Sequence, residues 1–179
     1  MSEGTQHQQQ ERDKDDAEVV SLSDASDICA QLMERYSKSS APQHSHLLAS
    51  AVAMRSILES ESLPLTPAGY FAAAISAIDN ASVSDALDLT ALSALLSFLA
   101  ITLPLVPPTG ISASNASEAV GVLVVLLGKK SLTVSTVRAA VKCLGILLGF
   151  CNLEDWGSVQ LGFDTLLKFS VDRRPKVCI

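Results

Sequence analysis

Two consecutive apolar segments between Ala119 and Cys151, AVGVLVVLLGKKSLTVSTVRAAVKCLGILLGFC, constrain the fold more than any other part of the chain. The first segment, Ala119 to Leu127, is apolar on every side, which is typical of a helix enclosed between neighbours. It ends at Gly128, a residue suited to a left-handed C-cap, and the cations Lys129 and Lys130 follow beside the negative end of the helix dipole. This pattern predicts the first helix of a helical hairpin.

The second helix of this hairpin is predicted after a cap at Thr133 or Ser135. Its apolar stripe recurs at intervals of three and four residues: Val137, Val141, Leu144, Leu148 and Cys151. The opposite stripe consists of Arg138, Lys142, Gly145 and Gly149. The two glycines either lower helix propensity without a structural role or, because glycine has no side chain, allow another backbone to approach this face closely, and we favour the close approach.

Charge is distributed unevenly along the 179 residues, whose net charge is −6. Residues 1–27 contain 8 acidic and 2 basic residues, whereas the rest of the chain contains 11 of each, with the bases concentrated after residue 128. Residues 1–20 are polar and rich in glutamine, which predicts a disordered tail followed by a helical domain over 21–179. A content of 48% hydrophobic but only 4% aromatic residues indicates a core of aliphatic side chains between packed helices.

Five further helices are predicted from capping residues and apolar periodicity. Their expected starts are Ser23, Pro42, the Thr66-Pro67 pair, Ser84 with Asp85 and Asp88 behind it, and Glu154-Asp155. The helix from Pro42 is expected to run to about Ser60, and the helix from Ser84 is expected to stop at Pro104. An eighth helix is expected to begin after Asp172.

The second helices of successive pairs therefore start near Pro42, Ser84 and Ser135. This spacing is close to the period of about 40 to 47 residues used by HEAT and armadillo repeats. We therefore expect an all-α, armadillo/HEAT-like α-solenoid of about three and a half helical hairpins, truncated in its last repeat. A compact seven-helix bundle is compatible with the same pattern.

The uncharged run from Leu89 to Val106 approaches the length of a membrane span. Hydroxyl side chains interrupt it, Pro104 ends it, and no cation flanks it, so we expect a buried helix and no membrane contact.

No catalytic motif is present: the chain lacks a phosphate-binding loop, a dinucleotide fingerprint, a nucleophile elbow and a zinc-protease motif. The four cysteines, Cys29, Cys143, Cys151 and Cys178, follow no metal or disulfide spacing and are expected to be reduced and mostly buried. His44 and His46 are two residues apart on a helix, so their side chains point apart and are expected to be exposed. We therefore predict no enzyme, no cofactor and no small-molecule substrate, with Trp156 as a core anchor.

One set of cations is a candidate contact surface for protein or RNA. It consists of Lys129, Lys130, Arg138, Lys142, Arg173, Arg174 and Lys176. Small basic patches of this kind also occur on solvated faces without partners, so both interpretations stay open.

Several stretches resemble one family closely, among them LPLTPAGYFAAAISAIDNAS, SEAVGVLVVLLGKK and LGFCNLEDWGSVQLGFDTLLKFSVDRRPKV. From about Ser23 to Val177 the chain resembles the N-terminal part of the plant ribosomal RNA-processing protein twelve-like family of armadillo/HEAT-repeat proteins. The resemblance implies a non-enzymatic scaffold of the nucleus and nucleolus that accompanies pre-ribosomal particles, supports ribosomal RNA processing and helps subunit export. Implied partners are pre-ribosomal proteins, ribosomal RNA and the nuclear transport machinery. A cytoplasmic protein-interaction adaptor of the same fold and a non-functional truncated isoform are the alternatives.

Overall fold

The computed structural model describes residues 27–83 and 88–171. Within these ranges the chain forms seven α-helices and one short 3-10 helix, and no strand. In chain order they are α2 (Ile28–Tyr36), α3 (Pro42–Ser60), α4 (Pro67–Val83), α5 (Leu89–Thr102), η1 (Leu103–Leu105), α6 (Ala113–Leu127), α7 (Val134–Leu147) and α8 (Trp156–Ser170). The predicted tail over 1–20 and the helix expected after Asp172 lie outside the described residues.

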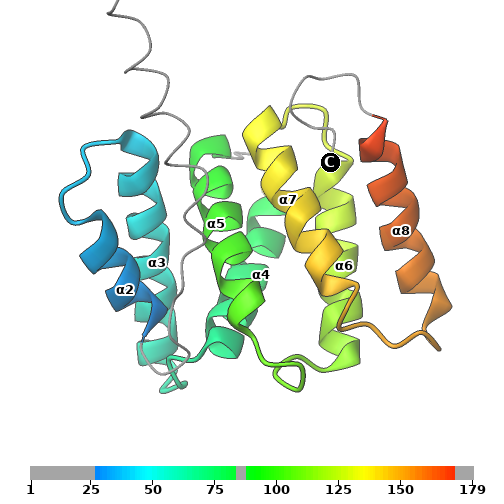
Figure 1. The fold of residues 1–179 in the computed structure, drawn as a ribbon, viewed down its shortest axis with the longest axis horizontal. Helices are drawn as coiled ribbons and strands as arrows, with labels where there is room; N and C mark the ends of the chain where they lie inside the picture. The colour runs from blue at the N-terminus through cyan, green and yellow to red at the C-terminus, as the bar shows by residue number, and fades with distance from the viewer. Residues whose placement is uncertain (1–26, 84–87, 172–179) are drawn as a thin grey trace, which may run out of the picture.

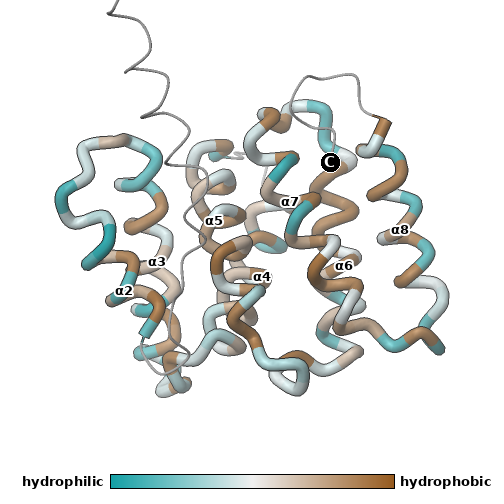
Figure 2. The backbone as a smooth tube through the Cα atoms, in the orientation of Figure 1, coloured by the Kyte–Doolittle hydropathy of each residue, from teal (hydrophilic) through white to brown (hydrophobic). Residues whose placement is uncertain are grey.

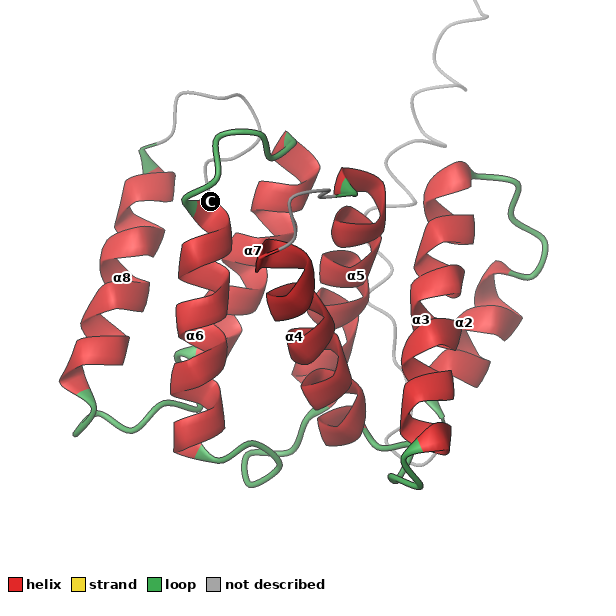
Figure 3. Cartoon of the chain, turned by 180° about the vertical axis from the view of Figure 1, so that it is seen from behind, coloured by secondary structure: helices red, strands yellow, loops and turns green. Residues whose placement is uncertain are grey.

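The helices form three antiparallel hairpins, α2–α3, α4–α5 and α6–α7, followed by α8 (Figure 1). Seen from behind, α4 and α6 lie in front of α5 and α7 (Figure 3). Helix α5 contacts α3 and α7 on either side, and α6 contacts α4 and α8 in the same way. The hairpins are therefore stacked in a row rather than gathered around a common centre, which confirms the predicted solenoid of three and a half hairpins.

Helix α5 is the most enclosed element. Of its 14 residues, eight are buried: Leu92, Ala94, Leu95, Leu96, Phe98, Leu99, Ala100 and Thr102. Figure 2 shows hydrophobic residues along α5, α6 and α7. The uncharged run from Leu89 to Val106 is thus explained by contacts with α3, α4 and α7. Among the described residues no helix is long and apolar enough to cross a membrane.

Helix starts marked by proline are confirmed. Helix α3 begins at Pro42 and α4 at Pro67, where the Thr66 hydroxyl accepts a hydrogen bond from the Gly69 amide at 3.2 Å. Of the two candidates predicted for the cap of α7, Thr133 is the N-cap residue: its hydroxyl accepts a hydrogen bond from the Thr136 amide at 3.3 Å. Proline at N1 and a preceding hydroxyl together fix a helix start strongly.

Two other helix starts were predicted wrongly. Helix α2 is capped by Asp27 and α5 by Asp88, each carboxylate accepting from amides of the following turn. The expected caps Ser23 and Ser84 lie outside the described residues, each four positions earlier. Aspartate caps a helix as well as serine does, so the first buried residue of each helix decides which is used.

Helix α6 also differs from its prediction at both ends. It begins at Ala113, capped by Ser112, so it is longer than the predicted segment from Ala119. Its end at Gly128 is as predicted, but Gly128 keeps a right-handed φ of −69°, so the left-handed cap is wrong. The Gly128 amide instead donates to the carbonyls of Val124 and Val125.

The close approach expected at Gly145 and Gly149 is also wrong, because both glycines are exposed and no other described helix comes within 4 Å of a Cβ atom built at either position. The close approach occurs at Gly162, a buried residue of α8. A Cβ atom built there would lie 2.7 Å from the Leu148 side chain and 3.3 Å from Val120. Glycine at this position therefore lets α8 lie close to α6 and to the end of α7.

A polar network closes the N-terminal end of the row. The Asp27 carboxylate accepts from the Cys29 amide at 3.1 Å, pairs with Arg55 of α3 at 2.9 Å, and accepts from the hydroxyl of Tyr70 of α4. The buried Tyr70 ring meets Phe98 of α5 edge to face, with centroids 5.6 Å apart. One carboxylate thus ties α2 to the next two helices.

Helix α8, at the other end, buries only Val159, Gly162 and Phe169. A second apolar stripe, about 120° around the helix, remains exposed: Trp156 (63%), Phe163 (57%) and Leu167 (56%). The prediction that Trp156 anchors the core is therefore wrong. Residues at helical spacing can form either of two stripes, and the neighbouring helices decide which one is buried.

Candidate interaction surface

The predicted cation set is divided by the fold. Lys129 is half-buried and its ammonium group donates to the Ser82 carbonyl, near the C-terminal end of α4. A cation there satisfies an open carbonyl and complements the helix dipole, so Lys129 has a structural role between α4 and the α6–α7 turn. Lys130 is exposed in the same turn.

Arg138 and Lys142 lie together on the exposed side of α7, one helical turn apart. The remaining members of the predicted set, Arg173, Arg174 and Lys176, lie outside the described residues. The structure thus brings together two of the seven predicted cations as an exposed pair.

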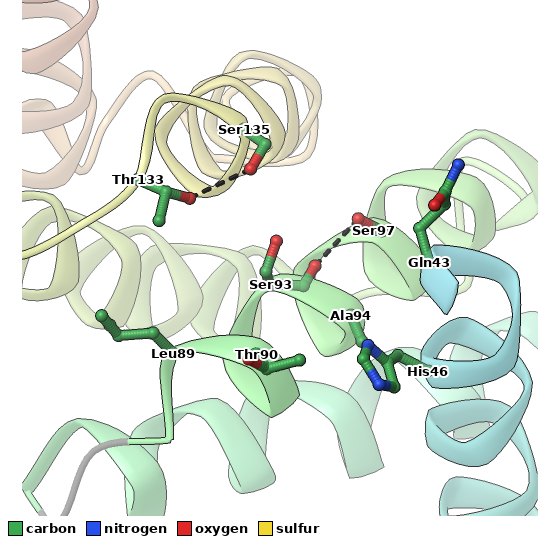
Figure 4. A pocket seen from close by; sticks show the side chains of 9 residues that line it. All are labelled: Gln43, His46, Leu89, Thr90, Ser93, Ala94, Ser97, Thr133 and Ser135. Atoms are coloured by element: carbon green, nitrogen blue, oxygen red, sulfur yellow. Dashed lines mark hydrogen bonds between the residues drawn. The ribbon is translucent and has the colours of Figure 1, made fainter. Parts of the chain in front are cut away.

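A pocket of ≈ 260 Å³ opens at the edge where α3, α5 and α7 begin (Figure 4). Polar side chains form most of its wall: Gln43, His46, Thr90, Ser93, Ser97, Thr133 and Ser135. Hydrogen bonds within the wall hold some of these hydroxyls in place. Ser97 donates to the Ser93 carbonyl at 2.8 Å, and the Thr133 and Ser135 hydroxyls lie 3.0 Å apart.

This pocket continues onto the basic side of α7. Ser135 lines the pocket, and Arg138 follows it three positions later on the same helix face. Hydroxyl donors and nearby cations are the groups that proteins use to contact phosphate oxygens and polar backbone atoms. We call the pocket together with Arg138 and Lys142 the α7 surface.

The α7 surface was only partly predictable. Its two cations were selected from the sequence, whereas the pocket residues come from three different helices and follow no linear motif. The signal that could have identified them is the spacing of Thr90, Ser93 and Ser97 along one face of α5, with Thr133 and Ser135 at the start of α7, once the stacking of these helices is known.

The histidines are placed differently from one another. His46 is exposed in the pocket wall, as predicted, but His44 is half-buried. The His44 ring stacks on Tyr36, with centroids 4.1 Å apart, and its Nδ1 atom lies 2.6 Å from the Ser39 hydroxyl. Among the described residues no group of three or more His, Cys, Asp or Glu side chains is arranged to hold a metal ion.

The three described cysteines are free thiols. Cys29 and Cys143 are buried, and burial raises the pKa of Cys143 to about 12. Cys151 is half-exposed, and burial raises its thiol pKa as well. A raised pKa keeps a thiol protonated and poorly nucleophilic, so these side chains are suited to packing rather than to covalent chemistry.

Stacked antiparallel hairpins, with contact surfaces on the outer helices and between neighbouring repeats, define a HEAT-type helical-repeat scaffold. Within this class, the family model described as RRP12-like, N-terminal HEAT repeats, matches residues 14–178. The chain belongs to that family, and its repeats are a scaffold of the ribosome-biogenesis type. No characterised protein and no solved structure matched the chain in the same comparisons.

Proposed function

We propose that this chain is a non-enzymatic scaffold that accompanies pre-ribosomal particles in the nucleus and nucleolus, supports ribosomal RNA processing and helps export of the subunits. The observation that carries the proposal is its membership of the RRP12-like family over residues 14–178. The stacked repeats support it because such proteins act by presenting extended surfaces to partners.

The proposed partners are pre-ribosomal proteins, ribosomal RNA and the nuclear transport machinery. The α7 surface is the proposed RNA contact, because Arg138 and Lys142 are exposed and no acidic side chain lines the adjoining pocket. Lys130 and the three cations Arg173, Arg174 and Lys176 remain proposed contributors. Lys129 is left out because it is half-buried and its ammonium group already donates to the Ser82 carbonyl.

Localisation and co-purification test the cellular role. The full chain carrying a fluorescent tag is expected to accumulate in the nucleus and nucleolus, and affinity purification is expected to recover ribosomal RNA precursors. A uniformly cytoplasmic signal together with recovery of no precursor RNA or pre-ribosomal protein would contradict the proposal and favour a cytoplasmic adaptor.

The RNA contact is tested by salt dependence. In the double variant Arg138→Gln/Lys142→Gln, binding to single-stranded RNA should weaken equally for all sequences. The slope of log affinity against log salt should fall by about 1.4, because each lost phosphate contact on a single strand contributes about 0.7. The matched control is Lys38→Gln/Lys168→Gln, which removes two exposed cations from α8 and from the loop before α3.

An unchanged slope in the α7 double variant, or an equal fall in the control, would remove the α7 surface from the RNA interface. The variant Arg173→Gln/Arg174→Gln/Lys176→Gln then tests the remaining cations by the same measurement.

A further inference from the structure

Helices α4 and α6 carry one charged residue each, Asp79 and Glu118. Both carboxylates line the same groove, a pocket of ≈ 280 Å³ between the two helices. Because the two helices carry no other charged residue, these two carboxylates give the groove a negative electrostatic potential.

Part of this groove is apolar, and we call that part its floor, while Ser76 and Asn115 line the groove as well. Phe71 and Ile75 lie one turn apart on α4, and Val122 faces them from α6. Phe71 is only 4% exposed, while Ile75 and Val122 are half-buried and keep part of their surface in contact with solvent. The groove can therefore bury an aliphatic or aromatic side chain of a ligand.

Neither carboxylate is neutralised within the described part of the chain. Asp79 and Glu118 are both exposed, and no ion pair joins either of them to a described lysine or arginine. Two uncompensated carboxylates beside an apolar floor favour a ligand that brings cations, and they repel phosphate. The groove is therefore complementary to a basic peptide and unsuited to nucleic acid.

We propose that the α4–α6 groove binds a lysine- or arginine-bearing segment of a partner protein, with an apolar side chain on the floor and cations at Asp79 and Glu118. The segment lies on the layer of α4 and α6, whereas Arg138 and Lys142 belong to α7 of the other layer. The scaffold thus offers an acidic groove for a basic protein segment and a separate basic surface for an anionic partner. This proposal stands on the groove itself and does not depend on the role in ribosome biogenesis.

The test uses the full chain and a fluorescent peptide in which lysines flank two leucines, with binding followed by anisotropy. Binding to the wild-type chain is expected to weaken as salt rises. The variant Asp79→Asn/Glu118→Gln is expected to weaken binding about fivefold, since each exposed ion pair contributes modestly. The variant Val122→Thr keeps the shape and the charge, so it should lower affinity without changing the salt dependence.

Two controls separate the groove from acidic residues elsewhere on the chain and from its net negative charge. Glu34→Gln/Asp164→Asn removes the same charge from exposed positions on α2 and α8 and should leave the affinity unchanged. A peptide with glutamate in place of lysine should not bind. Equal loss in the groove and control variants, or unchanged affinity in Asp79→Asn/Glu118→Gln with a native circular dichroism spectrum, would overturn the proposal.

Discussion

The two ends of this row of helices are finished in different ways. At the N-terminal end, Asp27 joins α2 to Arg55 of α3 and to the buried Tyr70 of α4. At the other end, α8 packs on α6 and α7 and leaves Trp156 and Phe163 more than half exposed. One end is closed by a polar network, and the other presents an apolar stripe to solvent.

The difference shows what a helix needs in order to lie inside such a row. Helix α6 contacts α4, α7 and α8, so it must be apolar on several faces. Helix α8 has a second apolar face as well, whereas α2 contacts α3 and exposes the charged residues Glu34 and Arg35 beside Ala30 and Met33. By its amphipathicity, α8 resembles an inner helix and α2 a terminal one. Four predictions test this comparison.

The largest effect is expected from Tyr70→Ala. The substitution removes a fully buried ring that contacts Phe98 and donates to Asp27, so the free energy of unfolding should fall by about 3–5 kcal/mol. Urea unfolding followed by circular dichroism measures it. Tyr36→Ala, at a half-buried ring of α2, is the control and should cost clearly less. Equal losses would show that Tyr70 does not hold the closed end.

The attachment of α8 is tested at Gly162. A valine there would place its Cβ against Leu148 and Val120, so Gly162→Val should lower the free energy of unfolding by about 1–3 kcal/mol. Gly145→Ala is the matched control. Nothing lies near that position, so the control should stabilise the chain by up to about 1 kcal/mol through helix propensity. Tolerance of valine at residue 162 would mean that α8 is held loosely.

Much of the fold could be predicted because its strongest signals are local. Proline fixed the starts of α3 and α4, and apolar periodicity identified α5, α6 and α7. The capping aspartates Asp27 and Asp88 could not be separated from serines four residues earlier, because both residue types cap helices equally well. Their choice depends on which residue first meets the core.

The other wrong predictions concern which neighbouring helix packs against a given residue. Trp156 and Val159 are three residues apart on α8, so the sequence spacing alone is compatible with burial of either. The packing of α8 against α6 and α7 buries Val159 and leaves Trp156 exposed. The sequence does not distinguish Gly145, Gly149 and Gly162 from one another. Within the described part of the chain, only Gly162 of these three lies against another helix. The α4–α6 groove and the pocket beside α7 likewise combine residues from several helices, so neither has a linear motif.

The polar network at the closed end should also depend on pH. Burial and the hydrogen bond to Asp27 raise the pKa of Tyr70 above its usual value near 10, so the folded chain prefers the protonated phenol. The stabilisation is complete below about pH 10 and is lost as the pH rises further. Tyr70→Phe should cost about 1–2 kcal/mol at pH 8, and the difference from wild type should shrink above pH 10.

This pH profile is measured by urea unfolding of both proteins between pH 8 and 11. Burial raises the pKa of Cys143 to about 12, so its thiol also contributes less to the free energy of unfolding as the pH rises over this range. This contribution is the same in both proteins and cancels when they are compared. A constant difference between wild type and Tyr70→Phe at every pH would show that the Tyr70 hydroxyl does not titrate as part of the network.

The smallest effect is expected at the exposed stripe of α8. Because Phe163 and Leu167 already lie in solvent, Phe163→Gln/Leu167→Gln should change the free energy of unfolding by no more than about 0.5 kcal/mol per site. The only tryptophan of the chain, Trp156, reports on the same stripe. Its emission in the folded protein should be red-shifted, and acrylamide should quench it almost as strongly as in urea. A blue-shifted, protected tryptophan that becomes exposed in the double variant would show that the stripe is covered, and that both ends of the row are closed after all.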